Sequence, residues 1–176
     1  MDSISLIAMR REKDTFMKEH PQSPLSPEQQ ARFTHLPYYE PNPALDLIVQ
    51  VEPVEGDHDI QIETTSGTTR TYTRFGRFTF SVDGVEAMLT IYEAPHGYFL
   101  PFVDANAGLE TYSGGRYLEP EELPGGKFHV DFNQAYNPYC AYAPGWSCPI
   151  PPYENRIEVA IRAGEKLPEG DWVEVG

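Results

Sequence analysis

The feature that most constrains the fold of this chain is the stretch of residues 131–155, D-F-N-Q-A-Y-N-P-Y-C-A-Y-A-P-G-W-S-C-P-I-P-P-Y-E-N. It combines several prolines and aromatic residues with both cysteines of the chain. Each proline removes a backbone donor and fixes φ, so the stretch forms neither a regular helix nor a central strand. We expect an ordered loop, held by the packing of its own aromatic rings. Because long ordered loops on a rigid scaffold often carry function, this 131–155 loop is the first candidate for a site.

The length of 176 residues indicates one domain, 1–176, which buries roughly 70% of the surface of its unfolded chain. Within it we expect a helical segment at 1–36 packed on a sheet, a β core at 45–166 and a C-terminal tail at 167–176. Trp172 is the expected anchor of this tail. Hydrophobic residues make up 40% of the chain, which argues against disorder.

The net charge of the chain is −14, with 27 acidic against 13 basic residues. Such a charge repels phosphate backbones and anionic lipid heads, so we expect no nucleic-acid or membrane partner. No apolar run reaches the ~18 residues that span a bilayer. The opening M-D-S-I-S-L-I-A-M-R-R lacks the basic start and the apolar length of a secretory signal, so we expect a cytoplasmic protein.

Two helices are predicted at the N-terminus. Residues 3–20 carry apolar residues at partly helical spacing, and Pro21 ends this pattern. Ser26-Pro27-Glu28-Gln29 then gives an N-cap serine, a proline at the first helical position and a glutamine three residues after the cap. This capping box predicts a short second helix through Phe33.

From Leu45 onward the apolar period changes to two, which predicts strands. Ser66-Gly67 and Asp83-Gly84 are turn signals between alternating segments, so each predicts a hairpin. Gly76 interrupts the pattern and is expected to separate two strands. The segments with strand character are 45–51, 59–65, 68–75, 77–82, 85–92, 98–103, 116–118, 127–132 and 157–161.

These elements predict a mainly β (α+β) protein. So many short strands spaced by turn residues indicate an antiparallel β-sandwich or a partly open barrel, with two short N-terminal helices.

Several motifs resemble those of a known family. They are F-L-P-F-V-D at 99–104, E-T-Y-S-G-G-R-Y-L at 110–118, D-F-N-Q-A-Y-N-P-Y-C-A-Y at 131–142, S-C-P-I-P-P-Y-E-N at 147–155 and A-G-E-K at 163–166. The chain is similar in these motifs to the bacterial and archaeal family catalogued as "domain of unknown function" sixteen eighty-four. The resemblance covers most of the chain and implies no particular activity, cofactor or catalytic residue.

Cys140 and Cys148 allow three interpretations. In the first, they are two half-buried thiols packed in the loop. A disulfide, which would contribute roughly 2.5 kcal/mol on the chain-entropy model, is the second, although a reducing cytosol disfavours it. A metal ligand or a nucleophile is the third, but two cysteines without C-x-x-C spacing are a weak zinc signal. We therefore predict no metal site.

Asp131 and Asn133 lie two residues apart on an apparent strand and so share a face with His129. At a strand end that enters the loop, these side chains could line a pocket, and His129 could act as a base for Cys140. The alternative is a solvated strand face on which Asp131 and Asn133 cap loop amides.

Ser113-Gly114-Gly115-Arg116-Tyr117 is the second cluster. Paired glycines can present a concave run of backbone N–H groups, and Arg116 could clamp an anion bidentately. The alternative is a tight turn with Arg116 paired to an acid such as Asp104 or Glu154.

Asp104 and Glu154 each follow a segment rich in proline and aromatic residues. If they met in one pocket, their pKa values could be driven apart, so that one carboxyl group would act as a general acid and the other as a general base. The tyrosines of the 131–155 loop could form a stacking wall for a ligand, or they could hydrogen-bond the backbone of their own loop.

We therefore expect a binding module for a small, anionic molecule, with a pocket formed by the 131–155 loop and the 110–118 segment. An enzyme of hydrolase or lyase type, using carboxylates or Cys140 in the same pocket, is the first alternative, and a structural or interaction protein without a small ligand is the second. The candidate ligand-binding residues are Asp104, Tyr112, Arg116, Tyr117, Asp131, Asn133, Tyr136, Asn137, Cys140, Tyr142, Glu154 and Asn155.

Overall fold

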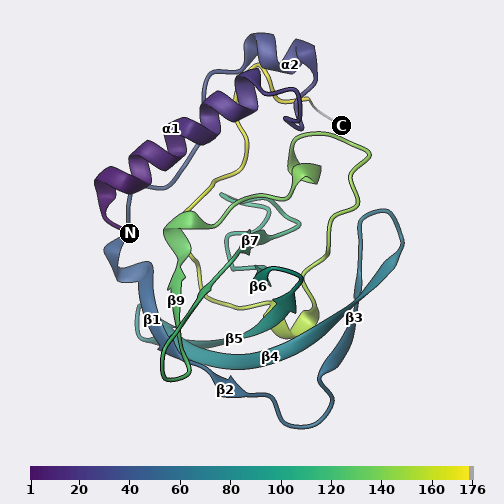
Figure 1. Ribbon diagram of the computed structural model, residues 1–176. Helices are drawn as coiled ribbons and strands as arrows, with labels where there is room; N and C mark the ends of the chain where they lie inside the picture. Colours follow the sequence, from purple (N-terminus) through teal and green to yellow (C-terminus); the bar gives the residue numbers. More distant parts are fainter. Residues whose placement is uncertain (175–176) are drawn as a thin grey trace.

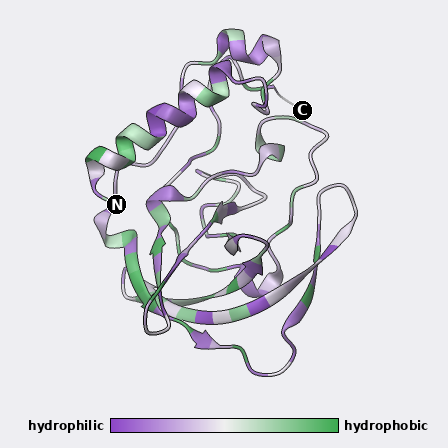
Figure 2. Cartoon of the chain, viewed as in Figure 1, coloured by the Kyte–Doolittle hydropathy of each residue, from purple (hydrophilic) through white to green (hydrophobic). Residues whose placement is uncertain are grey.

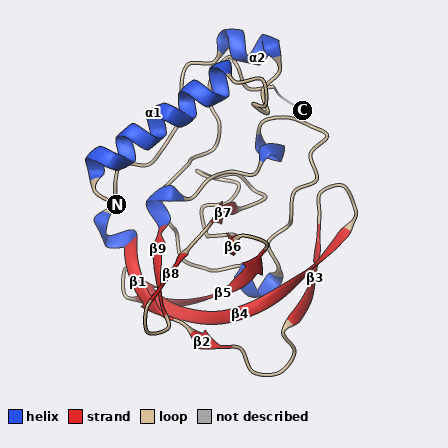
Figure 3. Ribbon diagram, in the orientation of Figure 1, coloured by secondary structure: helices blue, strands red, loops and turns tan. Residues whose placement is uncertain are grey.

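Two antiparallel sheets form an open, sandwich-like arrangement in the computed structural model, which describes residues 1–174 (Figure 1). The protein is mainly β, as predicted, and its two α-helices lie together at one end, beyond the sheets (Figure 3). The last two residues of the predicted tail, 175–176, lie outside the described residues.

Both predicted helices are present. Helix α1 spans Ser3–Glu19, and the side chain of Asp2 caps it by accepting a hydrogen bond from the Ser5 amide at 3.0 Å. Helix α2 spans Pro27–Arg32 and begins with the predicted capping box. In that box Ser26 Oγ accepts from the Gln29 amide, and Gln29 Oε1 accepts from the Ser26 amide.

The larger sheet has the strand order β2-β4-β5-β6-β7, and β3 also pairs with β4. Its strands are β2 (Glu52–Pro53), β3 (Asp59–Glu63), β4 (Thr69–Val82), β5 (Val85–Ala94), β6 (Gly97–Phe102) and β7 (Arg116–Leu118). Both predicted hairpins are confirmed. In the β4–β5 turn, Asp83 and Gly84 have φ of +49° and +79°, the positive values that a tight hairpin turn requires.

The prediction that Gly76 separates two strands was wrong. Strand β4 runs through Gly76 as one long, curved strand, with only a shift of register between Arg74 and Gly76. A Cβ atom at Gly76 would lie 2.6 Å from the carbonyl oxygen of Glu52 on β2. The glycine is therefore needed for the close approach of β2 to β4, where it permits a bulge and does not end the strand.

The smaller sheet has the order β1-β9-β8. It consists of β1 (Asp46–Gln50), β8 (Glu121–Leu123) and β9 (Lys127–Asp131), and the short 3₁₀ turn η1 (Pro43–Leu45) leads into it. Strand β8 was not predicted, because it has three residues and two of them are acidic. Pairing with β9 through the turn at Gly125 and Gly126 defines it.

The predicted strand at 157–161 is absent, and this segment is irregular. Its backbone groups are satisfied in another way. The Ile157 amide donates to the Val103 carbonyl, and the Ile161 amide donates to the Asp104 carboxylate at 2.7 Å. Apolar alternation is present here without a neighbouring strand to complete a ladder.

The apolar side chains of residues 1–174 form two cores. The main core lies between the sheets and contains Phe78, Phe102, Phe128 and Phe132. The second core lies under the helices and contains Met17, Phe33, Tyr142 and Trp172. Figure 2 shows where apolar residues lie along the chain, among them green segments of β1, of β4 and of α1.

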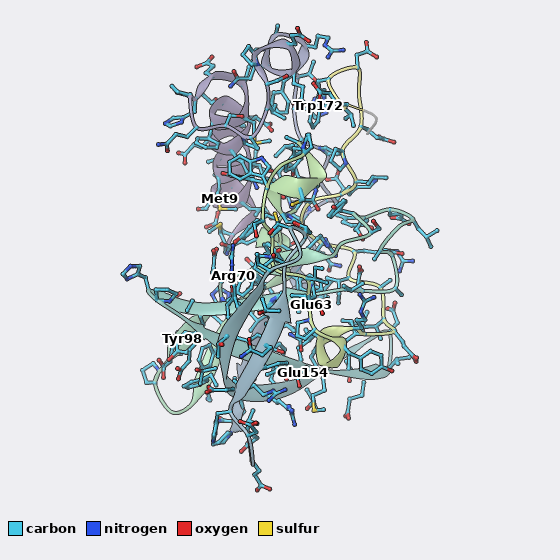
Figure 4. All side chains as sticks on the ribbon, turned by 90° about the vertical axis from the view of Figure 1, so that its right-hand side faces the viewer. Met9, Glu63, Arg70, Tyr98, Glu154 and Trp172 are labelled. Atoms are coloured by element: carbon cyan, nitrogen blue, oxygen red, sulfur yellow. The ribbon has the colours of Figure 1, made fainter. Side chains whose placement is uncertain are left out.

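Trp172 is the anchor of the C-terminal segment, as predicted. Its ring packs edge-on against Phe33, with centroids 5.0 Å apart, and it is 1% exposed. Figure 4 shows Trp172 at the helical end of the molecule and Glu154 at the sheet end. Among the described residues, no helix has both the length and the apolar character needed to cross a bilayer.

Candidate functional site

The 131–155 loop is irregular, as its prolines predicted, and three short 3₁₀ turns punctuate it. These are η2 (Phe132–Gln134), η3 (Tyr139–Ala141) and η4 (Tyr153–Asn155). Single antiparallel bridges tie the loop to the body of the protein, one between Tyr117 and Tyr136 and one between Thr64 and Pro149.

The tip of the β3–β4 hairpin supports the second half of the loop. Thr65 Oγ1 donates to the Trp146 carbonyl at 2.9 Å and accepts from the Cys148 amide at 3.0 Å. Arg70 on β4 adds a hydrogen bond to the Ser147 carbonyl at 3.0 Å. The backbone of loop segment 146–148 is therefore held against the hairpin, and Ser147 Oγ adds a side-chain contact with Ser66 Oγ at 2.8 Å.

A pocket of about 490 Å³ opens between the first and second halves of this loop. The end of β7 and one residue of helix α1 complete its walls. The lining residues are Lys13, Tyr117, Glu119, Tyr136, Asn137, Pro138, Tyr139, Trp146, Ser147, Cys148 and Pro149. The pocket lies within the usual size range of small-molecule sites, and its walls are mostly aromatic and proline rings.

Four aromatic rings in this pocket form two edge-to-face pairs. The rings of Tyr139 and Trp146 lie 5.0 Å apart at 70°, and those of Tyr117 and Tyr136 lie 5.9 Å apart at 87°. The Tyr117 hydroxyl donates to the Pro149 carbonyl, which fixes this ring to the second half of the loop. Trp146 is 42% exposed, so much of its ring is free for a ligand.

The pocket carries one acidic and one basic side chain. The Glu119 carboxylate accepts a hydrogen bond from the Tyr136 hydroxyl at 2.7 Å and is otherwise exposed. Burial, together with this carboxylate, raises the pKa of Tyr136 well above its usual value, so the phenol remains a neutral donor.

Lys13 is the basic side chain among the described pocket residues. Its ammonium group pairs with the buried Glu165 carboxylate at 2.8 Å and lies 5.1 Å from the centre of the Tyr136 ring. The positive charge of Lys13 is therefore neutralised within the protein, whereas the charge of Glu119 has no cationic partner among the described residues.

Arg116 does not line this pocket, and the expectation that it clamps an anion was wrong. Its guanidinium is 1% exposed and donates to the backbone carbonyls of Ile161, Ala163 and Glu165. It also contacts Asp104 at 3.4 Å. Arg116 thus binds the backbone of the irregular 157–165 segment, which has no strand ladder. The two glycines before it form a tight turn, in which the Gly115 amide donates to the Tyr112 carbonyl. This turn is the alternative interpretation of the cluster.

The two carboxylates considered for acid and base work do not meet. Asp104 is buried beside Arg116 and accepts from the Ile161 amide. Glu154 instead accepts from Tyr92, from Arg74 at 3.0 Å and from Arg77 at 3.4 Å. Burial alone would raise the pKa of Glu154, but these donors lower it overall. Each acid is paired with arginine, which is the structural alternative.

The remaining candidates divide between the pocket and the scaffold. Of the predicted site residues, Tyr117, Tyr136 and Asn137 line the pocket. Tyr142 belongs to the second core, and Asn155 binds the backbone of β5. Asn133 bridges to Asn42, whose amide donates to Asn133 Oδ1 at 2.8 Å. Tyr112 is half-buried against Gly114 outside the pocket.

Both cysteines are free thiols. Cys140 Sγ lies 3.2 Å from Thr65 Oγ1 and 3.3 Å from the Trp146 carbonyl. Burial, and then the hydrogen bond with Cys140, raise the pKa of the Cys148 thiol to about 11. A raised pKa is the opposite of what a nucleophile needs, so the interpretation as packed thiols fits Cys148 best.

Asp131 lies away from the pocket, beside His129 and Asp46 on the smaller sheet. These three residues bring two carboxylates and an imidazole within 4.8 Å of one another. His129 hydrogen-bonds Asp46 at 2.5 Å and does not serve as a base for Cys140. The residue pattern at 129–133 predicted a shared face, but Asp46 was missed because it pairs from a distant strand.

Two charged residues of the pocket were also missed. Glu119 lies two residues after Tyr117, so the period of two along β7 places both on one face, and this signal was present in the sequence. Lys13 carries no comparable signal, because only the docking of α1 on the loop brings it to the pocket.

Comparison with known proteins identifies relatives without a described activity. Residues 31–166 match the family described as "Protein of unknown function (DUF1684)". The chain is also similar to the uncharacterized protein from gene locus rrnAC0354 of Haloarcula marismortui, known from a solution NMR structure. The two chains are 37% identical, with a TM-score of 0.68, over 93% of this chain and 92% of that one. No curated protein matches the chain.

Proposed function

Because the chain belongs to the DUF1684 family of proteins of unknown function, we propose its function from the pocket: it is a binding module for a small organic cation that carries an alkylated ammonium group. The observation that carries this proposal is the grouping of four aromatic rings with the carboxylate of Glu119 in one pocket.

The chemistry of the walls favours a cation over an anion. The negative faces of tyrosine and tryptophan rings attract alkylated ammonium groups, and the gain reaches about 2 kcal/mol when the group is desolvated. The ammonium of Lys13 already lies over the Tyr136 ring, which illustrates this preference within the protein itself. An anion would meet Glu119, and the one lysine of the pocket is occupied by Glu165.

The overall charge of the protein also favours a cationic ligand. A net charge of −14 raises the local concentration of cations around the protein and speeds their association. The same charge disfavours nucleic acid and anionic membranes as partners. We place this binding module in the cytoplasm, where free thiols such as Cys140 and Cys148 are stable.

Isothermal titration with choline and with its neutral isostere 3,3-dimethyl-1-butanol tests the proposal. The two molecules have nearly the same shape, so a difference in affinity reports the positive charge. We expect choline to bind at least about tenfold more tightly than the isostere, which corresponds to about 1.4 kcal/mol. Equal affinities, or tighter binding of an anion such as acetate, would contradict the proposal.

Two variants test whether the negative charge of Glu119 contributes to choline binding. Glu119→Gln keeps the shape of the side chain and removes its charge, so choline binding should weaken about five- to tenfold while binding of the isostere stays unchanged. Glu86→Gln is the matched control, because Glu86 is exposed at the far end of β5 and does not line the pocket. Equal choline affinity in the two variants would remove Glu119 from the site.

A further inference from the structure

A second cluster of charged side chains lies outside the pocket, on one face of the smaller sheet. The pairing of β1 with β9 places Asp46 directly opposite Asp131. His129 precedes Asp131 by two residues and therefore projects from the same face. Glu121 on β8 lies opposite His129 in the next ladder, so it extends the cluster across all three strands. The backbone register thus places these side chains on one face of the sheet, in two neighbouring rows.

Hydrogen bonds orient the buried member of this cluster. Asp131 Oδ1 accepts from the Asn133 amide at 3.0 Å and from Asn133 Nδ2 at 2.9 Å. Its other oxygen, Oδ2, accepts from Gln134 Nε2 at 3.3 Å. Partners of this kind hold a metal-binding carboxylate in one orientation while its second oxygen is free to coordinate an ion.

The space between the two carboxylates already attracts a positive charge. The terminal ammonium group of Met1 lies 2.7 Å from Asp46 Oδ2 and 3.4 Å from Asp131 Oδ2. A hollow of about 80 Å³ adjoins the cluster and is lined by Leu118, Glu119, Glu121, His129, Asp131 and Gln134. It offers room for water molecules that would complete the coordination shell of an ion.

We propose that Asp46, His129 and Asp131 form a binding site for one divalent first-row transition metal ion, such as Mn²⁺ or Zn²⁺. One imidazole and two carboxylates are ligands that these ions accept, whereas Mg²⁺ and Ca²⁺ prefer oxygen ligands alone.

The geometry of the cluster requires only small adjustments. The three ligand atoms lie within 4.8 Å of one another, and bonds of about 2.1 Å place the ligand atoms of one ion at most about 4.2 Å apart. Asp46 and His129 are both partly exposed, so their side chains can rotate and bring the ligand atoms to the separation that one ion requires. The ion displaces the Met1 ammonium and the hydrogen bond between His129 and Asp46. Glu121 supplies a further carboxylate at the rim.

Mn²⁺ is the probe for the test, because it has little affinity for the thiols of Cys140 and Cys148. After dialysis against EDTA, we titrate the protein with Mn²⁺ in excess Mg²⁺ and follow paramagnetic broadening in ¹H–¹⁵N spectra. Broadening centred on residues 46 and 129–131 at one ion per chain is the expected result. Broadening spread over the acidic surface, or its loss in excess Mg²⁺, would overturn the proposal.

Two variants then test the ligands. His129→Gln should lower the Mn²⁺ affinity at least tenfold, whereas His96→Gln, which changes an exposed histidine in the β5–β6 turn, should leave it unchanged. Asp46→Asn is the second ligand variant and should show the same loss, and a melting temperature close to that of the parent confirms that each variant is folded. Unchanged affinity in folded His129→Gln or Asp46→Asn would overturn the assignment.

Discussion

Asn155 and Thr90 are joined by two hydrogen bonds that imitate a step of a β-ladder. Asn155 Oδ1 accepts from the Thr90 amide at 2.8 Å, and its Nδ2 donates to the Thr90 carbonyl at 2.9 Å. The same Nδ2 also donates to the Pro101 carbonyl on β6 at 2.8 Å. Because Asn155 ends the 131–155 loop, this one side chain fixes the loop to two strands of the larger sheet.

Replacement of this amide should therefore be costly. Asn155→Ala leaves three buried backbone groups without partners, at about 1 kcal/mol or more each, so we expect a loss of about 3 kcal/mol in the free energy of unfolding. Urea unfolding measures it. Tyr153→Ala is the control, because Tyr153 belongs to the same turn but is 89% exposed, and it should change the stability by less than about 0.5 kcal/mol. Similar values for the two variants would refute this role of Asn155.

Arg116 should behave as a structural residue. Arg116→Met removes the donor to three carbonyls and leaves the buried Asp104 without its cation, so the free energy of unfolding should fall by about 3–5 kcal/mol. Arg156→Met, at an exposed arginine, should have little effect in the same denaturation experiment. A fully stable Arg116→Met protein would contradict the structural role.

The thiol of Cys148 should react slowly and with a steep dependence on pH. With its pKa at about 11, only about one molecule in a thousand carries the thiolate at pH 8. Alkylation by iodoacetamide, followed by mass spectrometry of the Cys148 peptide, should therefore accelerate about tenfold per pH unit between pH 8 and 10. A rate that levels off near pH 9, as for an ordinary thiol, would contradict the raised pKa.

Local signals in the sequence were sufficient for most of the fold. The capping box at Ser26 and the turn at Asp83-Gly84 each depend on a few adjacent residues, and both are present as predicted. The errors arose where distant contacts decide the outcome. Strand β4 continues through Gly76, where the absence of a Cβ atom lets β2 approach closely. Residues 157–161 form no strand, and Arg116 and Asp104 bind their backbone groups.

In the candidate site, too, local sequence patterns were informative, whereas contacts between distant residues were missed. Prolines and aromatic residues within 131–155 marked the loop that lines the pocket, and Tyr136 and Asn137 are among the lining residues. That they bind a ligand stays a prediction. Lys13 comes from a helix more than a hundred residues away, so no local pattern could place it there. Arg116 was misassigned because its sequence neighbours, two glycines, are equally suited to an anion site and to a tight turn.

The measurement that tests the central claim most directly is a titration of ¹⁵N-labelled protein with tetramethylammonium, followed by ¹H–¹⁵N NMR. This probe carries only the charge and the methyl groups that the four rings are proposed to hold. We expect saturable shifts concentrated at the amide groups of residues 117–119 and 136–148 and at the indole N–H of Trp146, with the Trp172 indole unaffected. Shifts distributed over the acidic surface without saturation, or no shift in the pocket, would contradict the account.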